Sequence, residues 1–243
     1  MSIPQLVQSA RFIFSGTVLE RGKSGVAQVP NSKNLVTARL DRSIRVDPVL
    51  GDLRGRTITV AVNSPERFSP GQRAVFFANS WVHGRGIAVR EVDHVDIGQE
   101  GDVTAEVAEL PHKHLRSRLA GADLVVLADV AKVDEPKPTF DRHAALWSTA
   151  ELRVLKVLRS ELRHEDHTQT VVFYFPTADC PPWNTKRRFR PGDRGIFILT
   201  SARREKVYGA DTLPEGALVA LDPADFHEES YEARIGQILT EIR

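Results

Sequence analysis

The sequence predicts a mainly β protein built from two similar five-stranded barrels in tandem, each with flanking amphipathic helices. The first observation is an internal repeat, because RFSPGQRAVFFANSW at 67–81 returns as RFRPGDRGIFILTSA at 188–202. The second is that the segments around both copies alternate apolar and polar residues, which is the period of a half-buried strand. The third is the length of 243 residues, which is enough for two small domains.

Strand-like segments surround each copy of the repeat and align in pairs. In 56–62, and again in 169–175, every second residue is β-branched or aromatic, so each segment has one apolar face. The five pairs of aligned segments are 11–20 with 123–132, 35–44 with 148–158, 56–62 with 169–175, 74–77 with 195–199, and 86–95 with 216–226. Each half therefore holds about five strands in roughly a hundred residues, a size typical of small single domains.

A Pro-Gly pair precedes the fourth strand in both halves, as Pro70-Gly71 and as Pro191-Gly192. Proline presets φ near −65°, and glycine tolerates a positive φ. The pair therefore predicts a tight reversal that feeds a strand.

Two signals of helix starts lie outside the strands. Ser2 as N-cap with Pro4 in the first turn predicts a short N-terminal helix. Leu110-Pro111 repeats that start signal, and Leu115 and Leu119 would then form one apolar stripe of a helix that ends before Gly121.

Two amphipathic helices are also predicted, one closing each half. Their apolar residues at helical spacing are Val103, Val107 and Leu110 in the first, and Tyr231, Ile235, Ile238 and Ile242 in the second. These assignments give a first barrel with a short N-terminal helix in 1–96, a helical connector in 97–121, and a second barrel with a C-terminal helix in 122–243.

Five short strands that close on themselves are typical of the OB-type barrel, and a pair of small open β-sandwiches is the alternative. Closure removes unpaired strand edges, so we expect OB-like barrels. The second half reads ADLVVLADVAKV, then TAELRVLKVLRS, a further strand, a loop with a cysteine, and FRPGDRGIFIL. This series resembles the netrin-like, TIMP-like branch of OB-fold domains, and the first half keeps FIFSGTV and FSPGQRAVFF.

The resemblance implies a barrel that serves binding rather than catalysis. Members of this branch are usually extracellular and braced by disulfides, whereas Cys180 is the only cysteine here. In the best-known members an N-terminal cysteine docks into a metalloprotease active site. Met1 and Ser2 stand at this N-terminus, so no protease-inhibitor role is carried over.

Composition sets the broad class. The net charge is +1, so no global field directs the chain to nucleic acid or to a membrane. The N-terminus lacks the basic and apolar regions of a secretory signal, and no apolar run is long enough to span a membrane. A single cysteine excludes an intramolecular disulfide, so we expect a reducing, cytoplasmic location, with a mature secreted fragment as the alternative.

A basic segment with aromatic neighbours is the sharpest functional signal in the second half. Its cations are Lys186, Arg187, Arg188, Arg190 and Arg194, followed by Arg203, Arg204 and Lys206. Trp183 and Tyr174 are the candidate stacking residues, and Phe189 is assigned to the core because it repeats Phe68. OB barrels hold single-stranded nucleic acid with this combination of groups, but acidic residues are interleaved here, so a salt-bridged rim is the alternative.

The remaining candidates are isolated. Trp81 is either an exposed interface anchor or a plug at the barrel end, whereas Trp147 begins a strand and is expected in the core. Cys180 has no nucleophile signature around it, and His164 with His167 lacks further zinc ligands. We therefore predict no catalytic residue, no metal and no cofactor.

Two functions remain. The first is a non-enzymatic binding or scaffold protein that engages an unidentified protein partner through its barrel loops, which differ between the halves. The second is a single-stranded nucleic-acid-binding tandem OB protein that uses Arg187, Arg188 and Arg190. The first requires an exposed apolar patch near Trp81 or the Cys180 loop, and the second requires a continuous basic surface with an exposed aromatic residue.

Overall fold

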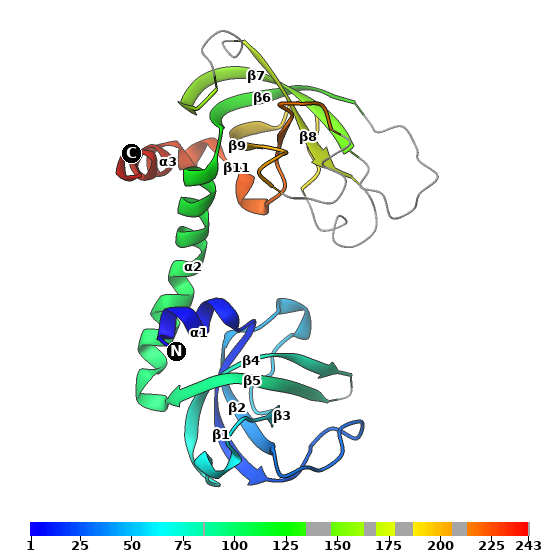
Figure 1. Cartoon of the computed structure of the whole chain (residues 1–243), viewed down its shortest axis with the longest axis vertical. Coiled ribbons are helices and arrows are strands. Elements are labelled where there is room, and N and C mark those ends of the chain that lie inside the picture. The colour runs from blue at the N-terminus through cyan, green and yellow to red at the C-terminus, as the bar shows by residue number, and fades with distance from the viewer. Residues whose placement is uncertain (85, 135–146, 163–168, 178–186, 206–212, 243) are drawn as a thin grey trace. The chain divides into compact units, whose positions relative to one another are not determined.

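A computed structural model shows two closed five-stranded β-barrels in tandem, as the sequence predicts (Figure 1). The structure describes residues 1–84, 86–134, 147–162, 169–177, 187–205 and 213–242. The chain divides into two compact units, Met1–Leu110 and Pro111–Arg243, and each is described by itself below.

The first barrel has the strand order β1-β2-β3-β5-β4, and β4 closes it by pairing with β1. Its strands are β1 (Phe12–Arg21), β2 (Leu35–Arg45), β3 (Thr57–Ala61), β4 (Arg73–His83) and β5 (Ile87–Asp96). The β3–β5 pair is parallel, in contrast to the antiparallel pairs around it. Phe76 fills the interior between Phe14 and Phe68, with ring centroids 5.0 and 5.6 Å away. This order with a parallel β3–β5 pair is an OB-like arrangement.

The second barrel repeats that order as β6-β7-β8-β10-β9, and β9 closes it on β6. Its strands are β6 (Leu124–Asp134), β7 (Trp147–Ser160), β8 (Thr170–Pro176), β9 (Arg194–Ser201) and β10 (Leu218–Val219), with β11 (Phe226–His227) added on β9. The β8–β10 pair is parallel, as its counterpart is in the first barrel. Phe189 is buried in this core, as predicted.

The repeat in the sequence is a repeat in hydrogen-bond register. β1 shifts register against β2 after Ile13, Ser15 and Val18, and β6 shifts against β7 at the three equivalent places. The Pro-Gly turns also match: the Gly71 N–H donates to Val18 O at 2.8 Å, and the Gly192 N–H donates to Val130 O at 2.9 Å. Both glycines have positive φ, 84° and 91°, which explains why both copies keep glycine.

The fifth strand is where the two barrels differ most. β5 is continuous, but its counterpart is split into β10 and β11 by a 3₁₀ turn at Pro223–Asp225. Val89 pairs with Ser80 on β4, and Leu218 pairs with Ser201, the residue of β9 that repeats Ser80. Val89 and Leu218 are therefore equivalent, and the predicted alignment of Gly86 with Gly216 is wrong by one residue. The same register makes Phe226 the counterpart of His94, since they pair with Phe197 and Phe76.

The N-terminal helix α1 (Ile3–Ser9) begins after the predicted cap, Ser2. The predicted helix start at Leu110-Pro111 is wrong, because α2 (Glu100–Gly121) runs through Pro111 without a break. The physical reason is that both parts of α2 are anchored by packing. Val103 is buried in the first unit and Leu119 in the second.

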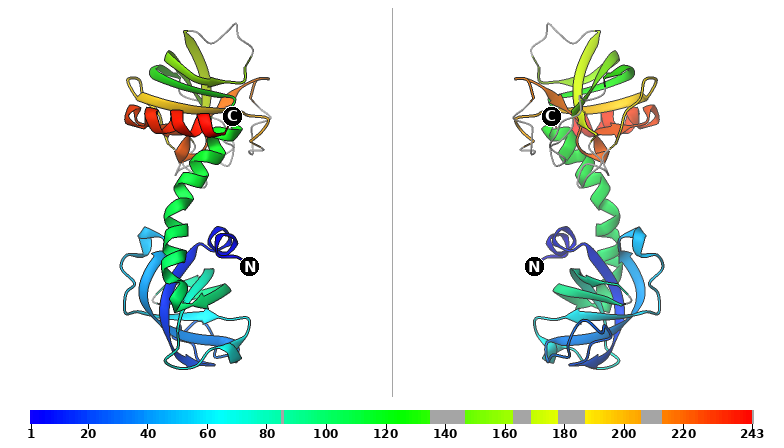
Figure 2. Two further views of the ribbon diagram at one scale, coloured as in Figure 1. Left: turned by 90° about the vertical axis from the view of Figure 1, so that its left-hand side faces the viewer. Right: turned by 90° about the vertical axis from the view of Figure 1, so that its right-hand side faces the viewer.

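The C-terminal helix α3 (Glu232–Glu241) lies across the outer face of the second barrel, against β6 and β9 (Figure 2). Ile235 and Leu239 are buried there. Tyr231 does not belong to the apolar stripe, because it precedes the helix in a 3₁₀ turn and is 43% exposed. None of the described helices combines the length and apolar composition of a membrane-spanning segment.

Candidate functional site

The basic segment that the sequence singles out is only partly within the described residues. Trp183 and Lys186 lie outside them. The Arg187 guanidinium lies over the Phe226 ring, 3.8 Å from its centroid, and 5.5 Å from the ring of Phe189. Arg188 is exposed and donates to Thr177 O at 3.2 Å.

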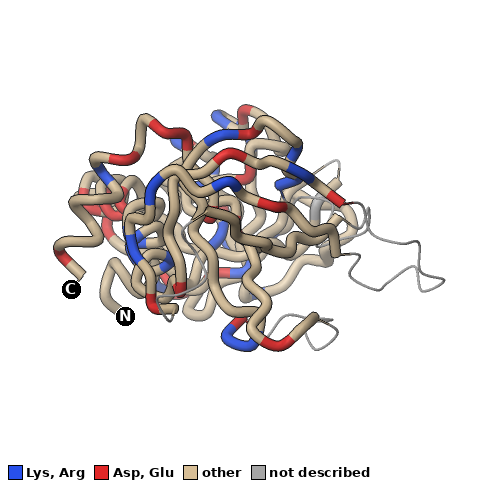
Figure 3. The backbone as a smooth tube through the Cα atoms, turned by 90° about the horizontal axis from the view of Figure 1, so that it is seen from above, with Lys and Arg blue, Asp and Glu red and all other residues tan. Residues whose placement is uncertain are grey.

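Arg190 is exposed, and its backbone N–H donates to Asp193 Oδ2 within the Pro-Gly turn. The other described arginines of the segment pair with separate carboxylates. These pairs are Arg194 with Glu229, Arg203 with Glu215, and Arg204 with Asp123. Figure 3 shows the same interleaving of basic and acidic residues along the chain. Arg187, Arg194, Arg203 and Arg204 are thus each engaged by an aromatic ring or a carboxylate, and Arg188 and Arg190 are the other exposed arginines of the segment.

Tyr174 lies on the outer side of β8, since its neighbours Phe173 and Phe175 are buried in the barrel core. It is half-buried against a small apolar cluster that includes Val219 and Trp147. Tyr174 is therefore a strand-surface residue with part of its ring covered. Trp147, expected in the barrel core, packs on this outer cluster instead.

Trp81 lies near the end of β4 and is 37% exposed. The Arg90 guanidinium covers one side of the ring at 5.1 Å from its centroid. Trp81 is thus neither a free anchor nor a buried plug. Its free edge remains available to a partner.

Cys180, His164 and His167 lie outside the described residues. Within the described ranges, no group of three or more His, Cys, Asp or Glu side chains is arranged to hold a metal ion.

Sequence reasoning missed the mouth of the first barrel, where β4 ends and β5 begins. A 3₁₀ turn at Pro48–Leu50 lies between two hollows of about 700 and 550 Å³. Val49 on this turn is 85% exposed, and both hollows are lined by Val49 and Leu50. The larger hollow reaches Ser80, the neighbour of Trp81. The only sequence signal was a short apolar turn, Pro48-Val49-Leu50, between Asp47 and Gly51.

Apolar side chains and arginines line this mouth. The apolar lining comprises Phe12, Val46, Pro48, Ile58 and Ile87, besides Val49 and Leu50. The cations are Arg11, Arg45 and Arg56, against one acid, Asp47. Asp47 accepts the Val49 N–H, whereas Arg11 and Arg56 have no side-chain partner within the described part of the chain. The larger hollow is therefore mainly apolar, the smaller one is mainly polar, and the mouth carries an excess of positive charge.

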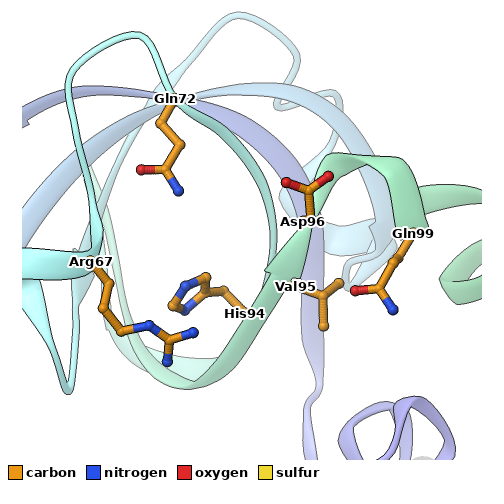
Figure 4. Close-up of a pocket in the computed structure, with 6 residues that line it drawn as sticks. All are labelled: Arg67, Gln72, His94, Val95, Asp96 and Gln99. Carbon is orange, nitrogen blue, oxygen red and sulfur yellow. The ribbon is translucent and has the colours of Figure 1, made fainter.

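A smaller hollow of about 340 Å³ lies at the opposite end of β4 and β5 (Figure 4). His94 and Glu91 form a buried pair beside it, with 2.7 Å between Nδ1 and Oε1 and side chains 9% and 2% exposed. The other Glu91 oxygen accepts the Asn63 N–H at 2.8 Å. Nδ1 is engaged by Glu91, so Nε2 is the ring nitrogen left for a ligand.

The strongest electrostatic cluster lies in the second unit and is structural. Asp225 is fully buried, and its carboxylate accepts from Arg118 Nε at 2.7 Å and Nη2 at 3.0 Å. The Leu221 and Asp222 backbone N–H groups donate to the same carboxylate, both at 2.8 Å. Burial raises the pKa of the Asp225 carboxyl, against the opposing effect of Arg118. The cluster ties α2 to the turn between β10 and β11.

Comparison with known proteins adds no assignment, because no protein-family model matches the chain and no curated protein is similar to it. The function therefore has to be argued from the two ends of the first barrel and from the contrast between the barrels.

Proposed function

We propose that the chain is a non-enzymatic binding protein whose first barrel docks a segment of a partner protein at its mouth. The observation that carries the proposal is the exposed Val49, which borders the larger, mainly apolar hollow on one side and a smaller, mainly polar hollow on the other. Isolated apolar side chains are common on protein surfaces, but an exposed one that borders an apolar hollow is typical of an interaction site. Trp81 follows Ser80 in β4 and is 37% exposed, so this end of β4 also carries an aromatic residue of the kind that dominates binding energy at interfaces.

The partner segment is expected to carry apolar side chains flanked by carboxylates. Arg11 and Arg56 at the mouth have no acidic partner within the described residues, so an acidic segment would supply one. Complementary charge of this kind mainly speeds association and selects the partner, while the apolar contacts supply affinity.

Two further features belong to the same proposal. The netrin-like type of barrel is supported by the motifs around FRPGDRGIFIL and FSPGQRAVFF, and this type serves binding. A reducing, cytoplasmic compartment is supported by the single cysteine, Cys180.

Affinity capture with matched variants tests the proposal. Val49→Asp places a charge between the two hollows, and Val172→Asp places the same charge on the 48% exposed Val172 of the second barrel. We expect a protein that the parent and Val172→Asp capture equally and that Val49→Asp loses. Recovery of the same proteins by all three would refute docking at the mouth.

The nucleic-acid alternative is tested in parallel with a labelled mixed-sequence single strand. Fluorescence anisotropy would be followed at several salt concentrations with the parent and with Arg187→Ala/Arg188→Ala/Arg190→Ala. We expect no binding at low salt. Binding that weakens steeply with salt and is lost in the variant would favour the alternative over a protein partner.

A further inference from the structure

We infer that the small hollow of the first barrel, beside His94, is a binding site for an oxyanion, either a carboxylate or a phosphate. The inference is independent of the proposed docking surface, which lies at the other end of β4 and β5. It rests on the hydrogen-bonding groups around the hollow and on a comparison with the second barrel.

Two donor side chains, Arg67 and Gln72, line the hollow together with His94 and Gln99, against one acid, Asp96. Figure 4 shows the side chains of Arg67 and Gln72, from the segment before β4, and of His94, from β5, around the same hollow. The Arg67 guanidinium has no hydrogen-bond or ion-pair partner within the described residues. Gln72 accepts the Ser69 N–H through Oε1 at 2.9 Å, so its amide NH₂ is left to donate. Guanidinium and amide donors suit a carboxylate or a phosphate.

The acids near the hollow are already engaged by donors. Asp93 accepts the N–H of His94 at 3.0 Å, and Asp96 accepts the N–H of Gly98 at 2.8 Å. Glu91 is shared between His94 and the Asn63 N–H. The acids therefore mainly hold the backbone and the imidazole in place.

The second barrel provides a reference, because the same end there is built for the opposite charge. The register makes Phe226 the counterpart of His94, and the repeated turn makes Asp193 the counterpart of Gln72. A phenyl ring and a carboxylate both attract cations. That end is covered by the chain's own cation, the Arg187 guanidinium, which lies over Phe226.

The first barrel reverses each of these features. It has an imidazole in place of the phenyl ring, an amide in place of the carboxylate, and Glu66 in the repeat position of Arg187. Arg67 is kept in the repeat as Arg188. The second barrel thus fills its end with an internal cation, whereas the first has donors and a hollow of about 340 Å³, near the lower end of the range for small-molecule sites.

NMR titration of the full-length protein tests the inference. Sodium phosphate and sodium succinate would be added separately at constant ionic strength, with sodium chloride as the reference. We expect saturable shifts of the Gln72 side-chain amide and the His94 ring. A response to succinate alone assigns a carboxylate ligand, and a response to phosphate alone assigns a phosphate ligand. No saturable response of these groups to either anion would overturn the site.

Variants that copy the second barrel separate binding from folding. Gln72→Glu keeps an oxygen for the Ser69 N–H but replaces the amide donor with a carboxylate oxygen. His94→Phe introduces the phenyl ring that the second barrel has at the equivalent position, Phe226. We expect Gln72→Glu and Arg67→Ala to weaken binding at least about tenfold, since each removes a hydrogen bond to a charged group. Arg190→Ala in the equivalent turn is the control and should bind as the parent does. Unchanged binding by Arg67→Ala and Gln72→Glu, with unchanged amide spectra elsewhere, would exclude the site.

Discussion

Replacing Asp225 by asparagine should destabilise the second unit while leaving the first unchanged. Asp225 is completely buried, and four donor groups converge on its carboxylate: two from Arg118 and two from the backbone. Asparagine keeps one oxygen, which can still accept the two backbone N–H groups. Its NH₂ group then faces a guanidinium nitrogen, so a donor meets a donor.

The magnitude follows from the bonds that are lost. The Asp225→Asn variant would lose the charge-assisted hydrogen bond from Arg118 Nε to Oδ1, and the bond from Nη2 to Oδ2 would become a weaker one to a neutral amide oxygen. Each charge-assisted bond contributes about 1.5–3 kcal/mol. Burial raises the pKa of the Asp225 carboxyl, which shows that desolvation offsets part of the stabilisation from these hydrogen bonds. We therefore use the lower end of the range. The remaining partner of Arg118 is Glu205, at 2.6 Å. We therefore expect a loss of about 3 kcal/mol in the free energy of unfolding of the second unit, within the range measured for broken buried ion pairs.

Urea unfolding with calorimetry measures this loss, and the two units have to be followed separately because a two-domain chain need not unfold in one step. Trp81 fluorescence reports on the first unit, provided that Trp147 and Trp183 are replaced by phenylalanine in every protein compared. Asp222→Asn is the matched control, because Asp222 is partly exposed and pairs with His114 on the surface. A loss below about 1 kcal/mol for Asp225→Asn, or an equal loss for Asp222→Asn, would refute the assignment of Asp225 as the anchor of α2.

Two further predictions concern the repeated turn and the pH response. Gly71→Ala and Gly192→Ala should each destabilise their own unit by about 1–2 kcal/mol, since both positions have positive φ. Chemical denaturation that follows each unit separately measures this loss, and a neutral effect of either change would contradict the prediction. Burial lowers the pKa of His227, so folding favours its neutral ring. That contribution is fully present above the unfolded pKa of about 6.5 and is lost as the pH falls from there toward the folded value. The free energy of unfolding should therefore fall less in His227→Gln than in the parent between pH 7.5 and 5.5. Urea midpoints that fall equally in both proteins over this range would contradict the prediction.

The strands and the Pro-Gly turns were predictable because local chemistry determines them. Alternating apolar residues give a strand wherever one face is buried, and the positive φ of Gly71 requires glycine in both copies. The helix through Pro111 was not predictable from local chemistry, because packing at Val103 and Leu119 overrides the start signal. The split of the last strand into β10 and β11 was not predictable for a similar reason. Asp225, in the turn that separates them, pairs with Arg118, which is 107 residues away in sequence.

The candidate sites were harder to predict than the fold. Val49 looked like an ordinary loop residue, because its exposure between two hollows depends on strands from the whole barrel. Glu91 and His94 are three residues apart in a strand, a spacing that normally places side chains on opposite faces. β5 shifts register against β4 between Glu91 and Asp93, and this irregularity brings the two side chains together. Only the register of the neighbouring strand reveals it.

The contrast between the barrels also indicates where function lies. Both copies keep the turn glycine, the register shifts and the interior phenylalanines, because each of these is needed to close a barrel. The residues that differ at matching positions are not needed for closure, since the other barrel closes without them. His94 against Phe226 is the clearest case: either ring packs on the repeated phenylalanine, Phe68 or Phe189. An imidazole buried against Glu91 gives the barrel no packing that a phenyl ring does not, so ligand binding at this end is the simplest reason for it to be there.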